Sequence, residues 1–222
     1  MKPLNKIKLE WSANFAYAIG LLTTDGNLSP DGRHFDLTSK DKQQLLNFMK
    51  CLQIKVKIGL KTSGYTGKKI THIQFGNINL YKFLLKIGLT PAKTKTMGVL
   101  KIPDGFFFDF LRGHYDGDGT FYSYWDPRWR SSFMFYLVFA SASKPHIDWL
   151  RTTIYRLNRI KGHITGKEKD GIYYLKYAKG ETLKLLAKMY YNDKVICLSR
   201  KLLKIKKALY IESNHDKNAR VL

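Results

Sequence analysis

The chain has 222 residues, and its 44% hydrophobic and 14% aromatic content excludes a disordered protein and allows one domain or two small ones. A total of 39 Lys and Arg residues against 17 Asp and Glu residues gives a net charge of +22, which favours a polyanionic partner over a small neutral ligand. Because no apolar run is long enough to cross a bilayer and the start "MKPLNKIKLEW" lacks the apolar core of a secretory signal, we expect no membrane partner and an intracellular protein, in the cytoplasm or in an organelle with its own genome.

The first half of the chain predicts a helix, two strands, a second helix, two further strands and a closing helix. The first helix starts after Ser12, a suitable N-cap, and ends at Asp25 and Gly26. The second helix, in "SKDKQQLLNFMKCL", is expected to be capped by Ser39. Strands are predicted in "IKVKIGLK" and "THIQF", where apolar and polar residues alternate, and the closing helix lies in "LYKFLLKIGLTPAKT".

The second half repeats this order. A helix ends at Asp118 and Gly119, strands are predicted in "RIKGHITGK" and "YYLKY", and the half closes with a helix and a basic turn in "TLKLLAKMYYNDKVICLSRKL". The tail "SNHDKNARVL" has no periodicity and is expected to fray. Each half therefore reads αββαββα, and we expect two halves, 1–100 and 101–222.

An internal duplication supports this division. "AIGLLTTDGNL" matches "LRGHYDGDGTF", and in both segments a glycine, Gly20 or Gly113, precedes an Asp-Gly pair by the same number of positions. That spacing selects Asp118, rather than Asp116, as the counterpart of Asp25. Two similar halves should bind two similar surfaces.

Alternation within the strands predicts a basic outer face on each sheet. In "IKVKIGLK", the apolar residues Ile54, Val56, Ile58 and Leu60 would face helices while the lysines between them point outward. A lysine row on one strand is more often plain solvation, but both halves show it beside side chains that can read base edges. The candidate nucleic-acid contacts are Asn27, Ser29, Arg33, Lys55, Lys57, Lys61, His72, Gln74, Tyr122, Tyr124, Arg128, Arg130, Ser132, Tyr136, Lys161, His163, Lys167, Tyr174 and Lys176.

The duplicated helix ends carry an unfavourable charge. An Asp at a helix C-terminus meets the negative end of the helix dipole, at a cost of about 0.3 to 1 kcal/mol. A divalent cation shared by the two carboxylates would offset that cost if the helix ends meet. Small residues at helical spacing, Gly20 with Thr24 and Gly113 with Gly117, would let the two helices approach closely.

Each Asp-Gly pair could instead be an ordinary turn, because both residues are favoured there. The same spacing of glycine and Asp-Gly in both halves favours a shared metal site over two ordinary turns. Hard oxygen ligands suit Mg²⁺, which keeps waters and binds one or two carboxylates together with substrate phosphate. Two carboxylates on a basic surface therefore predict phosphodiester hydrolysis.

The segments "AIGLLTTDG" and "LRGHYDGDG" resemble the paired motifs of single-chain LAGLIDADG homing endonucleases, although Thr23 stands where the family motif has Asp. The resemblance spans nearly the whole chain. It implies an α+β fold in which two pseudo-twofold related αββαββα halves form a saddle over DNA. It also implies a monomer that cuts both strands of a long, nearly palindromic site.

The resemblance further implies site residues. In that family the last acidic residue of each motif binds the metals, which corresponds to Asp25 and Asp118, and the backbone carbonyls of Thr24 and Gly117 would assist. A basic residue near each centre is also usual, and the two turn lysines that match each other, Lys93 and Lys201, are our choices for that catalytic role. Both lysines could equally be ordinary phosphate contacts.

A further position lies where the second strand meets the second helix. Aligning "LTSKDKQQLL" with "FASASKPHID" places Ser39 opposite Ser141 and Lys40 opposite Ala142. Lys40 would then act in only one of the two catalytic sites. Unequal nicking of the two strands in Lys40→Ala would support this hypothesis, and equal slowing would oppose it.

Three functions fit these observations. The leading one is Mg²⁺-dependent cleavage of double-stranded DNA. The second keeps the fold without the chemistry, as a maturase for the host intron RNA or as a non-cleaving DNA-binding protein. The third, a general basic nucleic-acid-binding protein, leaves the paired aspartates unexplained.

Overall fold

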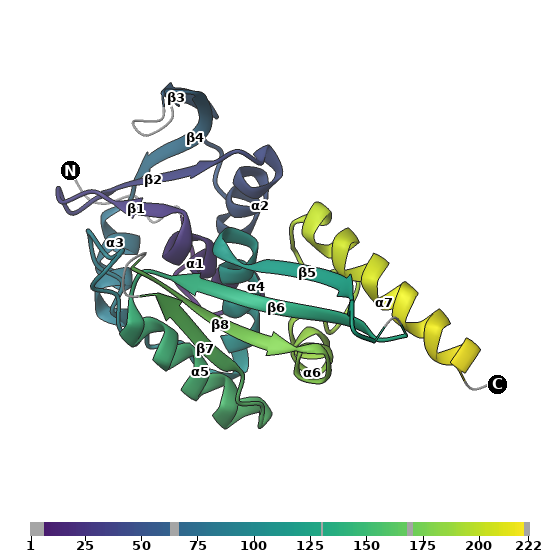
Figure 1. Cartoon of the computed structure of the whole chain (residues 1–222). Coiled ribbons are helices and arrows are strands. Elements are labelled where there is room, and N and C mark those ends of the chain that lie inside the picture. Colours follow the sequence, from purple (N-terminus) through teal and green to yellow (C-terminus); the bar gives the residue numbers. More distant parts are fainter. Residues whose placement is uncertain (1–6, 63–66, 130, 168–170, 220–222) are drawn as a thin grey trace.

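A computed structural model describes residues 7–62, 67–129, 131–167 and 171–219, with 167 and 215–219 described by backbone alone (Figure 1). The elements of the first half are α1 (Ala13–Thr24), β1 (Gly26–Leu28), β2 (His34–Ser39), α2 (Lys42–Leu52), β3 (Gly59–Thr62), β4 (Lys69–Gly76) and α3 (Ile78–Ile87). Those of the second half are η1 (Asp104–Phe106), α4 (Phe107–Asp118), β5 (Thr120–Trp125), β6 (Phe133–Ser141), α5 (Lys144–Asn158), β7 (His163–Lys167), β8 (Ile172–Ala178), α6 (Lys179–Met189) and α7 (Ser199–Ala219).

The structure confirms an α+β fold with two αββαββα halves. The two four-stranded antiparallel sheets have the same strand order, β1-β2-β4-β3 and β5-β6-β8-β7. Their registers also agree, because Ser39 pairs with Thr71 in the first sheet and Ser141 pairs with Tyr173 in the second. The duplication read from the sequence therefore extends to individual strand pairs.

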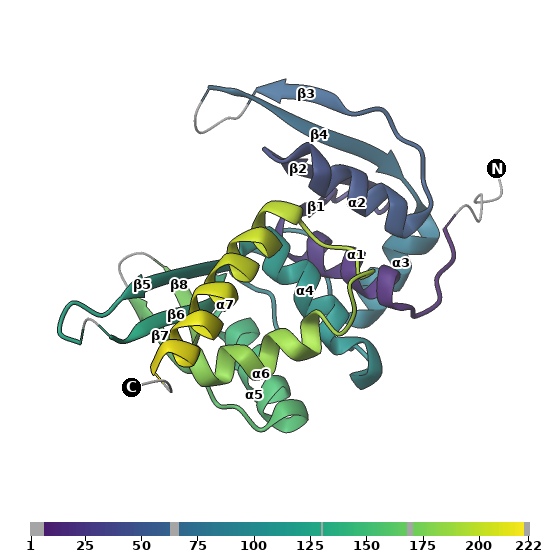
Figure 2. The same cartoon turned by 90° about the vertical axis from the view of Figure 1, so that its right-hand side faces the viewer.

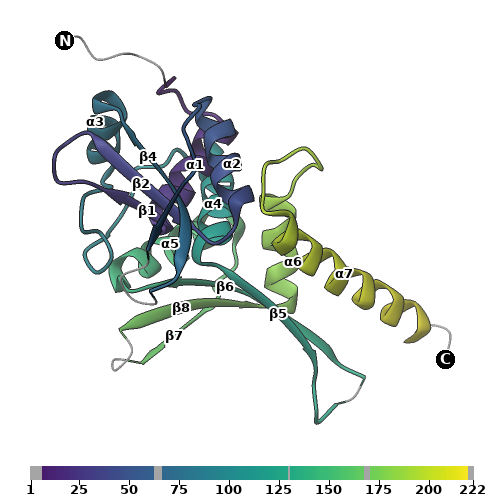
Figure 3. The same cartoon turned by 90° about the horizontal axis from the view of Figure 1, so that it is seen from above.

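Helices α1 and α4 lie side by side between the two sheets (Figures 1 and 2). Helix α1 is apolar on all sides and is buried from Phe15 to Thr23, as expected for a helix enclosed by other elements. Helices α2 and α3 lie beside the first sheet, and α5 and α6 pack on the second sheet (Figure 3). Each half thus presents one helix-covered face and one open face of its sheet.

The crossing of α1 and α4 depends on two glycines. A Cβ atom at Gly20 would overlap the carbonyl oxygen of Phe110, and a Cβ atom at Gly113 would overlap the carbonyl oxygen of Tyr17. The helices therefore meet backbone to backbone at both positions. Because the motif aspartates stand one turn further along, this crossing brings the two helix ends together.

The expected cap of the second helix is wrong. Ser12 caps α1 by accepting a hydrogen bond from Phe15 N (3.1 Å), but α2 is capped by Asp41, whose carboxylate accepts from Gln43 N (3.0 Å). Ser39 is the last residue of β2, and its hydroxyl accepts from Asp41 N (3.0 Å). The strand runs further than the sequence indicated, so the cap moves to the next suitable side chain.

The strand predicted in "IKVKIGLK" is shorter than expected. Strand β3 starts only at Gly59, because residues 54–58 carry the chain from the left-handed cap at Gln53 to the sheet edge. Leu60, expected to face helices, is 65% exposed on this edge strand. The second half shows the same behaviour, with a left-handed cap at Arg159 and a strand that starts at His163.

The C-terminal segment also differs from the prediction. One closing helix and a basic turn were expected, but the structure has two helices, α6 and α7, and α7 continues through the expected frayed tail to Ala219. Helix α7 projects from the body of the molecule (Figures 1 and 3). Within the described ranges, no helix combines the length and the apolar character needed to cross a membrane.

Candidate active site at the paired helix ends

The two motif aspartates lie next to each other. Asp25 follows the last residue of α1, and Asp118 is the last residue of α4. A Cβ atom at Gly117 would overlap the hydroxyl of Thr24 and would lie 2.8 Å from Asp25 Oδ2. Asp118, the next residue in the chain, therefore stands beside Asp25 where the helices meet.

The pKa of each aspartate reflects this crowding. Burial, followed by the charge of Asp118, raises the pKa of Asp25 to about 6. Asp118 keeps contact with solvent, but burial of its carboxylate raises its pKa as well, while Lys201 and Lys93 act in the opposite direction. Two carboxylates in one partly buried site repel each other, which is a setting that a cation would stabilise.

The two turn lysines occupy equivalent positions around the aspartates. The Lys93 ammonium donates to Gly26 O, and the Lys201 ammonium donates to Gly119 O (2.7 Å), so each binds the carbonyl that follows a motif aspartate. Lys201 also donates to Tyr115 O (2.6 Å) and to Gly117 O (3.1 Å). Burial lowers the pKa of both lysines to about 8, against the opposing charges of the aspartates.

The residues expected to offer backbone ligands lie at the same crossing. Gly117 O accepts from Lys201, which leaves its second lone pair available, and the Thr24 hydroxyl donates to Leu21 O (3.1 Å). In the part of the chain that the structure describes, no three His, Cys, Asp or Glu side chains form a metal cluster. The protein therefore supplies a partial set of oxygen donors, which fits Mg²⁺ only if water and substrate phosphate complete the coordination.

A residue that sequence reasoning missed contacts Asp25 directly. Gln44 is buried, its amide nitrogen donates to Asp25 Oδ2, and its carbonyl oxygen accepts from the Ser39 hydroxyl (2.8 Å). The hydrogen bond from the Gln44 side-chain amide stabilises the ionised carboxylate of Asp25, so it lowers the pKa of Asp25 while burial raises it. A polar residue on the buried face of α2 was the signal available in the sequence.

The second half replaces this amide by histidines. The register that aligns Ser39 with Ser141 aligns Gln44 with His146. The Nε2 atom of His146 lies 3.2 Å from Nε2 of His114, and its Nδ1 atom donates to Gly98 O (3.1 Å). Burial lowers the pKa of His146 to about 4, so the pair is neutral and serves the core. The two aspartates thus stand in unequal surroundings.

Asp116 has a structural role in this arrangement. It is fully buried, and its Oδ2 atom accepts from the Tyr17 hydroxyl (2.7 Å) and from Leu198 N (2.7 Å). These bonds tie α1 to the segment that precedes α7. Because Asp116 is engaged in these buried hydrogen bonds, Asp118 remains the counterpart of Asp25, as its spacing from Gly113 predicts.

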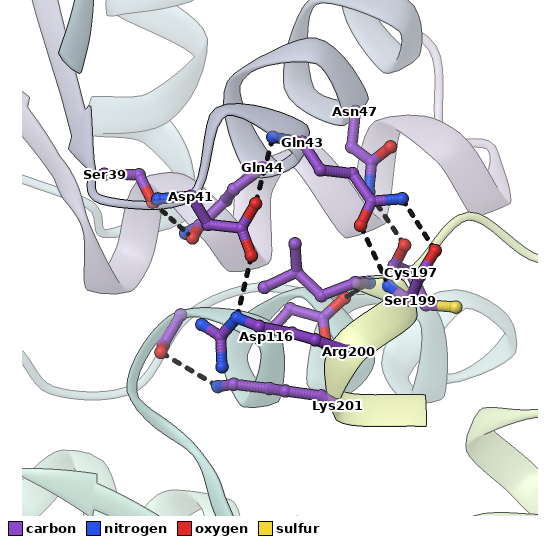
Figure 4. A network of polar contacts seen from close by, with 12 residues as sticks. Ser39, Asp41, Gln43, Gln44, Asn47, Asp116, Cys197, Ser199, Arg200 and Lys201 are labelled. Carbon is purple, nitrogen blue, oxygen red and sulfur yellow. Dashed lines mark hydrogen bonds and ion pairs between the residues drawn. The ribbon is translucent and has the colours of Figure 1, made fainter. Parts of the chain in front are cut away.

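A set of hydrogen bonds between α2 and the start of α7, which we call the α2–α7 clasp, holds Lys201 in place (Figure 4). Gln43 exchanges two bonds with Ser199, from its amide nitrogen to the hydroxyl (2.8 Å) and from Ser199 N to its carbonyl oxygen (3.0 Å). Arg200 pairs with Asp41 (2.7 Å), and Asn47 Nδ2 donates to Cys197 O (2.9 Å). The first half therefore positions a lysine that belongs to the second.

Lys40 lies apart from this arrangement. It is exposed in the turn between β2 and α2, whereas the cations that act on Asp25 and Asp118 are Lys93 and Lys201. Gln44, in the helix that follows, donates a hydrogen bond to Asp25, and the role of Lys40 in one catalytic site stays a prediction.

Most of the candidate nucleic-acid contacts lie on or beside the open faces of the two sheets. Lys55, Lys57 and Lys161 are exposed just before their edge strands, and Arg128 pairs with Asp126 (3.0 Å) near the β5–β6 tip. Arg130 and the Lys167 side chain lie outside the described residues. The candidates on strand outer faces are Asn27, Lys61, His72, Gln74, Tyr122, Tyr124, Tyr136, His163, Tyr174 and Lys176, and those in or beside the hairpin loops are Ser29, Arg33 and Ser132.

Comparison with solved structures identifies the fold. The LAGLIDADG meganuclease I-AabMI bound to uncleaved DNA superposes with a TM-score of 0.61 at 14% identity, over 92% of each chain. I-DmoI in complex with DNA and Mn gives 0.53 at 16% identity, over 81% of this chain and 97% of that one. Full-length DUF199/WhiA from Thermatoga maritima gives 0.55 at 16% identity, over 96% of this chain and 70% of that one. No protein-family model and no curated protein matches the sequence.

Proposed function

We propose that this chain, which has the LAGLIDADG homing endonuclease fold, is a site-specific endonuclease that cuts both strands of duplex DNA with Mg²⁺ or a similar divalent cation. The observation that carries the proposal is the convergence of Asp25 and Asp118 from equivalent ends of two duplicated helices, with the buried Lys93 and the half-buried Lys201 beside them. Because one chain supplies both carboxylates, the enzyme acts as a monomer.

The residues divide the work of phosphodiester hydrolysis. Asp25 and Asp118 would hold the cations, with the backbone carbonyls of Thr24 and Gly117 as further donors. A divalent cation held there would supply Lewis acidity toward the scissile phosphate and the attacking water, and positive charge for the leaving oxygen. Lys93 and Lys201 fix the motif ends through the carbonyls they bind, and their positive charges would stabilise negative charge that develops on the phosphate.

The charge of the chain and its structural neighbours support DNA as the partner. A net charge of +22 supplies the phosphate contacts on which duplex affinity largely depends. I-AabMI was solved with DNA, and I-DmoI with DNA and Mn. The open faces of both sheets carry the side chains proposed to contact the duplex.

The fold alone does not separate cleavage from binding, because WhiA, which is not named as a nuclease, also shares it. A DNA-binding protein or a maturase for the host intron RNA is therefore the alternative. Neither function needs two adjacent carboxylates, whose repulsion lowers the stability of a protein that binds no cation between them.

The test is cleavage of DNA that spans the junction of the sequences flanking this reading frame. A supercoiled plasmid carrying that junction should become linear with Mg²⁺ and stay intact with EDTA. Intact plasmid with Mg²⁺, together with tight binding of the same duplex, would support the binding protein instead.

Gln44→Leu should make the two strand cuts unequal. The substitution removes the amide that holds Asp25, and loss of such a supporting bond costs metal sites about 10- to 100-fold in activity. Because the other half has His146 at this position, we expect one strand to slow more and nicked circles to accumulate. Lys40→Ala is the matched comparison and should leave both cuts nearly equal. Unequal cuts in Lys40→Ala would return the role to Lys40, and equal slowing of both cuts in Gln44→Leu would contradict the role given to Gln44.

The Mg²⁺ requirement should depend on pH through Asp25. Its pKa is raised to about 6, so Asp25 is ionised at neutral pH and takes up a proton as the pH falls through that value. Because the proton competes with the cation, the Mg²⁺ concentration for half-maximal cleavage should rise by up to about tenfold per pH unit below the pKa. Mg²⁺ titrations of cleavage one pH unit above and one pH unit below the pKa of Asp25 would check this. An Mg²⁺ requirement that is the same at both pH values would contradict it.

A further inference from the structure

We infer that the open face of the second sheet reads 5-methyl groups of thymine in the major groove, so that one half of the DNA target is rich in thymine. The inference rests on the proposed DNA binding and adds the chemistry by which one half-site is recognised. It follows from the aliphatic side chains of Val138 and Ala140 in the middle of this outer face, from a hollow between its strands and from a contrast with the first sheet.

Pairing registers allow the two open faces to be compared position by position. Asn27 pairs with Asp36, which pairs with Gln74, and the equivalent row of the second sheet is Thr120, Val138 and Lys176. The next row is Thr38 and His72 in the first sheet, and Ala140 and Tyr174 in the second. His34 likewise corresponds to Tyr136. Two hydrogen-bonding side chains of the first face, Asp36 and Thr38, thus correspond to the aliphatic Val138 and Ala140, and both histidines correspond to tyrosines, while Thr120 and Lys176 stay polar.

The first face forms a connected polar surface. The Asp36 carboxylate accepts from Lys61 Nζ (2.8 Å) and from the Thr38 hydroxyl (3.1 Å), and it lies 3.4 Å from His72 Nδ1. Donors and acceptors of this kind recognise base edges by hydrogen bonding. This face suits direct polar readout.

The second face has Val138 where the first has the Asp36 carboxylate, and its polar contacts include a hydrogen bond between the side chains of Tyr124 and Tyr136. Tyr122, Tyr124 and Tyr136 stand parallel, with ring centroids 5.3 to 6.4 Å apart and interplanar angles of 4° to 17°. Beside them lies a hollow of about 220 Å³ lined by Thr120, Tyr122, Val138, Ala140, Tyr174 and Lys176. Lys176 stands 5.8 Å from the centre of the Tyr174 ring and is the cation at the rim.

The position of the hollow favours a base edge as its occupant. Thr120 follows Asp118 by two positions, so the hollow adjoins the proposed cleavage site. A lysine at an apolar hollow on a strongly basic protein suits a ligand that pairs a phosphate with an apolar group. In the major groove, thymine is the base that presents a methyl group, and apolar side chains recognise it there.

The test uses uracil, which differs from thymine only by the methyl group. Duplexes are first selected from a randomised library in EDTA, where cleavage is blocked. We expect the selected sites to have one thymine-rich half. Replacing thymine by uracil in that half should weaken binding by roughly fourfold per contacted methyl group, whereas the same replacement in the other half should have little effect.

A protein variant provides the matching control. Ala140→Asn introduces a polar side chain without a methyl group at the hollow, and it should reduce the loss per methyl group to less than about twofold. Thermal unfolding and the salt dependence of binding show whether the variant still folds and binds duplex DNA.

The outcomes separate this inference from the proposed function. Specific binding and cleavage without a thymine-rich half, or with no response to uracil, would overturn the methyl readout and leave the endonuclease in place. Absence of any salt-dependent duplex binding would overturn both.

Discussion

Replacing Asp25 or Asp118 by asparagine should abolish DNA cleavage, by roughly 10³-fold or more, while duplex binding in EDTA is retained. Asparagine keeps the shape of the side chain but removes the charge that holds a divalent cation. The lysines and the sheet faces that contact the duplex are unchanged. Loss of cleavage with retained binding therefore identifies a metal ligand.

These variants should also unfold at a higher temperature. Burial and the charge of Asp118 raise the pKa of Asp25 to about 6, so the ionised carboxylate present at neutral pH lowers the stability of the folded chain when no metal is bound. A neutral amide removes this repulsion and so raises the unfolding temperature. An unfolding temperature above that of the unchanged protein would exclude misfolding as the cause of lost activity. Asp148→Asn, which removes an exposed partner of Lys144 on α5, is the control and should cut normally. Cleavage near the original rate in Asp25→Asn or Asp118→Asn would mean that the carboxylates do not hold the catalytic metal.

Gly113→Ala should have the largest effect on stability, lowering the free energy of unfolding by about 3 kcal/mol or more. The added Cβ would overlap the carbonyl oxygen of Tyr17, and Gly20→Ala would meet the carbonyl oxygen of Phe110 in the same way. Backbone atoms inside two packed helices cannot move aside as a flexible side chain can. The helices would have to separate, which would also displace the aspartates.

Gly180→Ala is the matched control, because this helical glycine on α6 has no neighbour within 4 Å of an added Cβ. It should be neutral or stabilise the fold by about 0.5 to 1 kcal/mol. Chemical denaturation of the three variants would measure the difference. Equal stability of Gly113→Ala and Gly180→Ala would contradict the backbone contact between α1 and α4.

Repetition within the chain made much of this structure predictable. The matching positions of Gly20 and Gly113 ahead of their aspartates indicated the duplication, and alternation in the strands gave the order of elements that the structure confirms. The same repetition aligned Lys93 with Lys201, which the structure places at equivalent carbonyls. Patterns present in both halves carried information that a single copy would not.

Features present in only one half were harder to predict. Gln44 resembles any polar residue within an amphipathic helix, and only the three-dimensional structure brings it to Asp25. The α2–α7 clasp joins residues far apart in sequence, so local patterns did not indicate it or the second C-terminal helix. The cap at Asp41 was missed because β2 continues to Ser39, and strand length depends on pairing with β4.

The most direct test of the account is the anomalous scattering of Mn²⁺ in a crystal of the protein bound to its target duplex. We predict Mn²⁺ peaks between the carboxylates of Asp25 and Asp118 and a phosphate of each DNA strand. Duplex DNA bound across both sheets with Mn²⁺ elsewhere, and none at these carboxylates, would contradict the proposal that the two halves share a catalytic metal site.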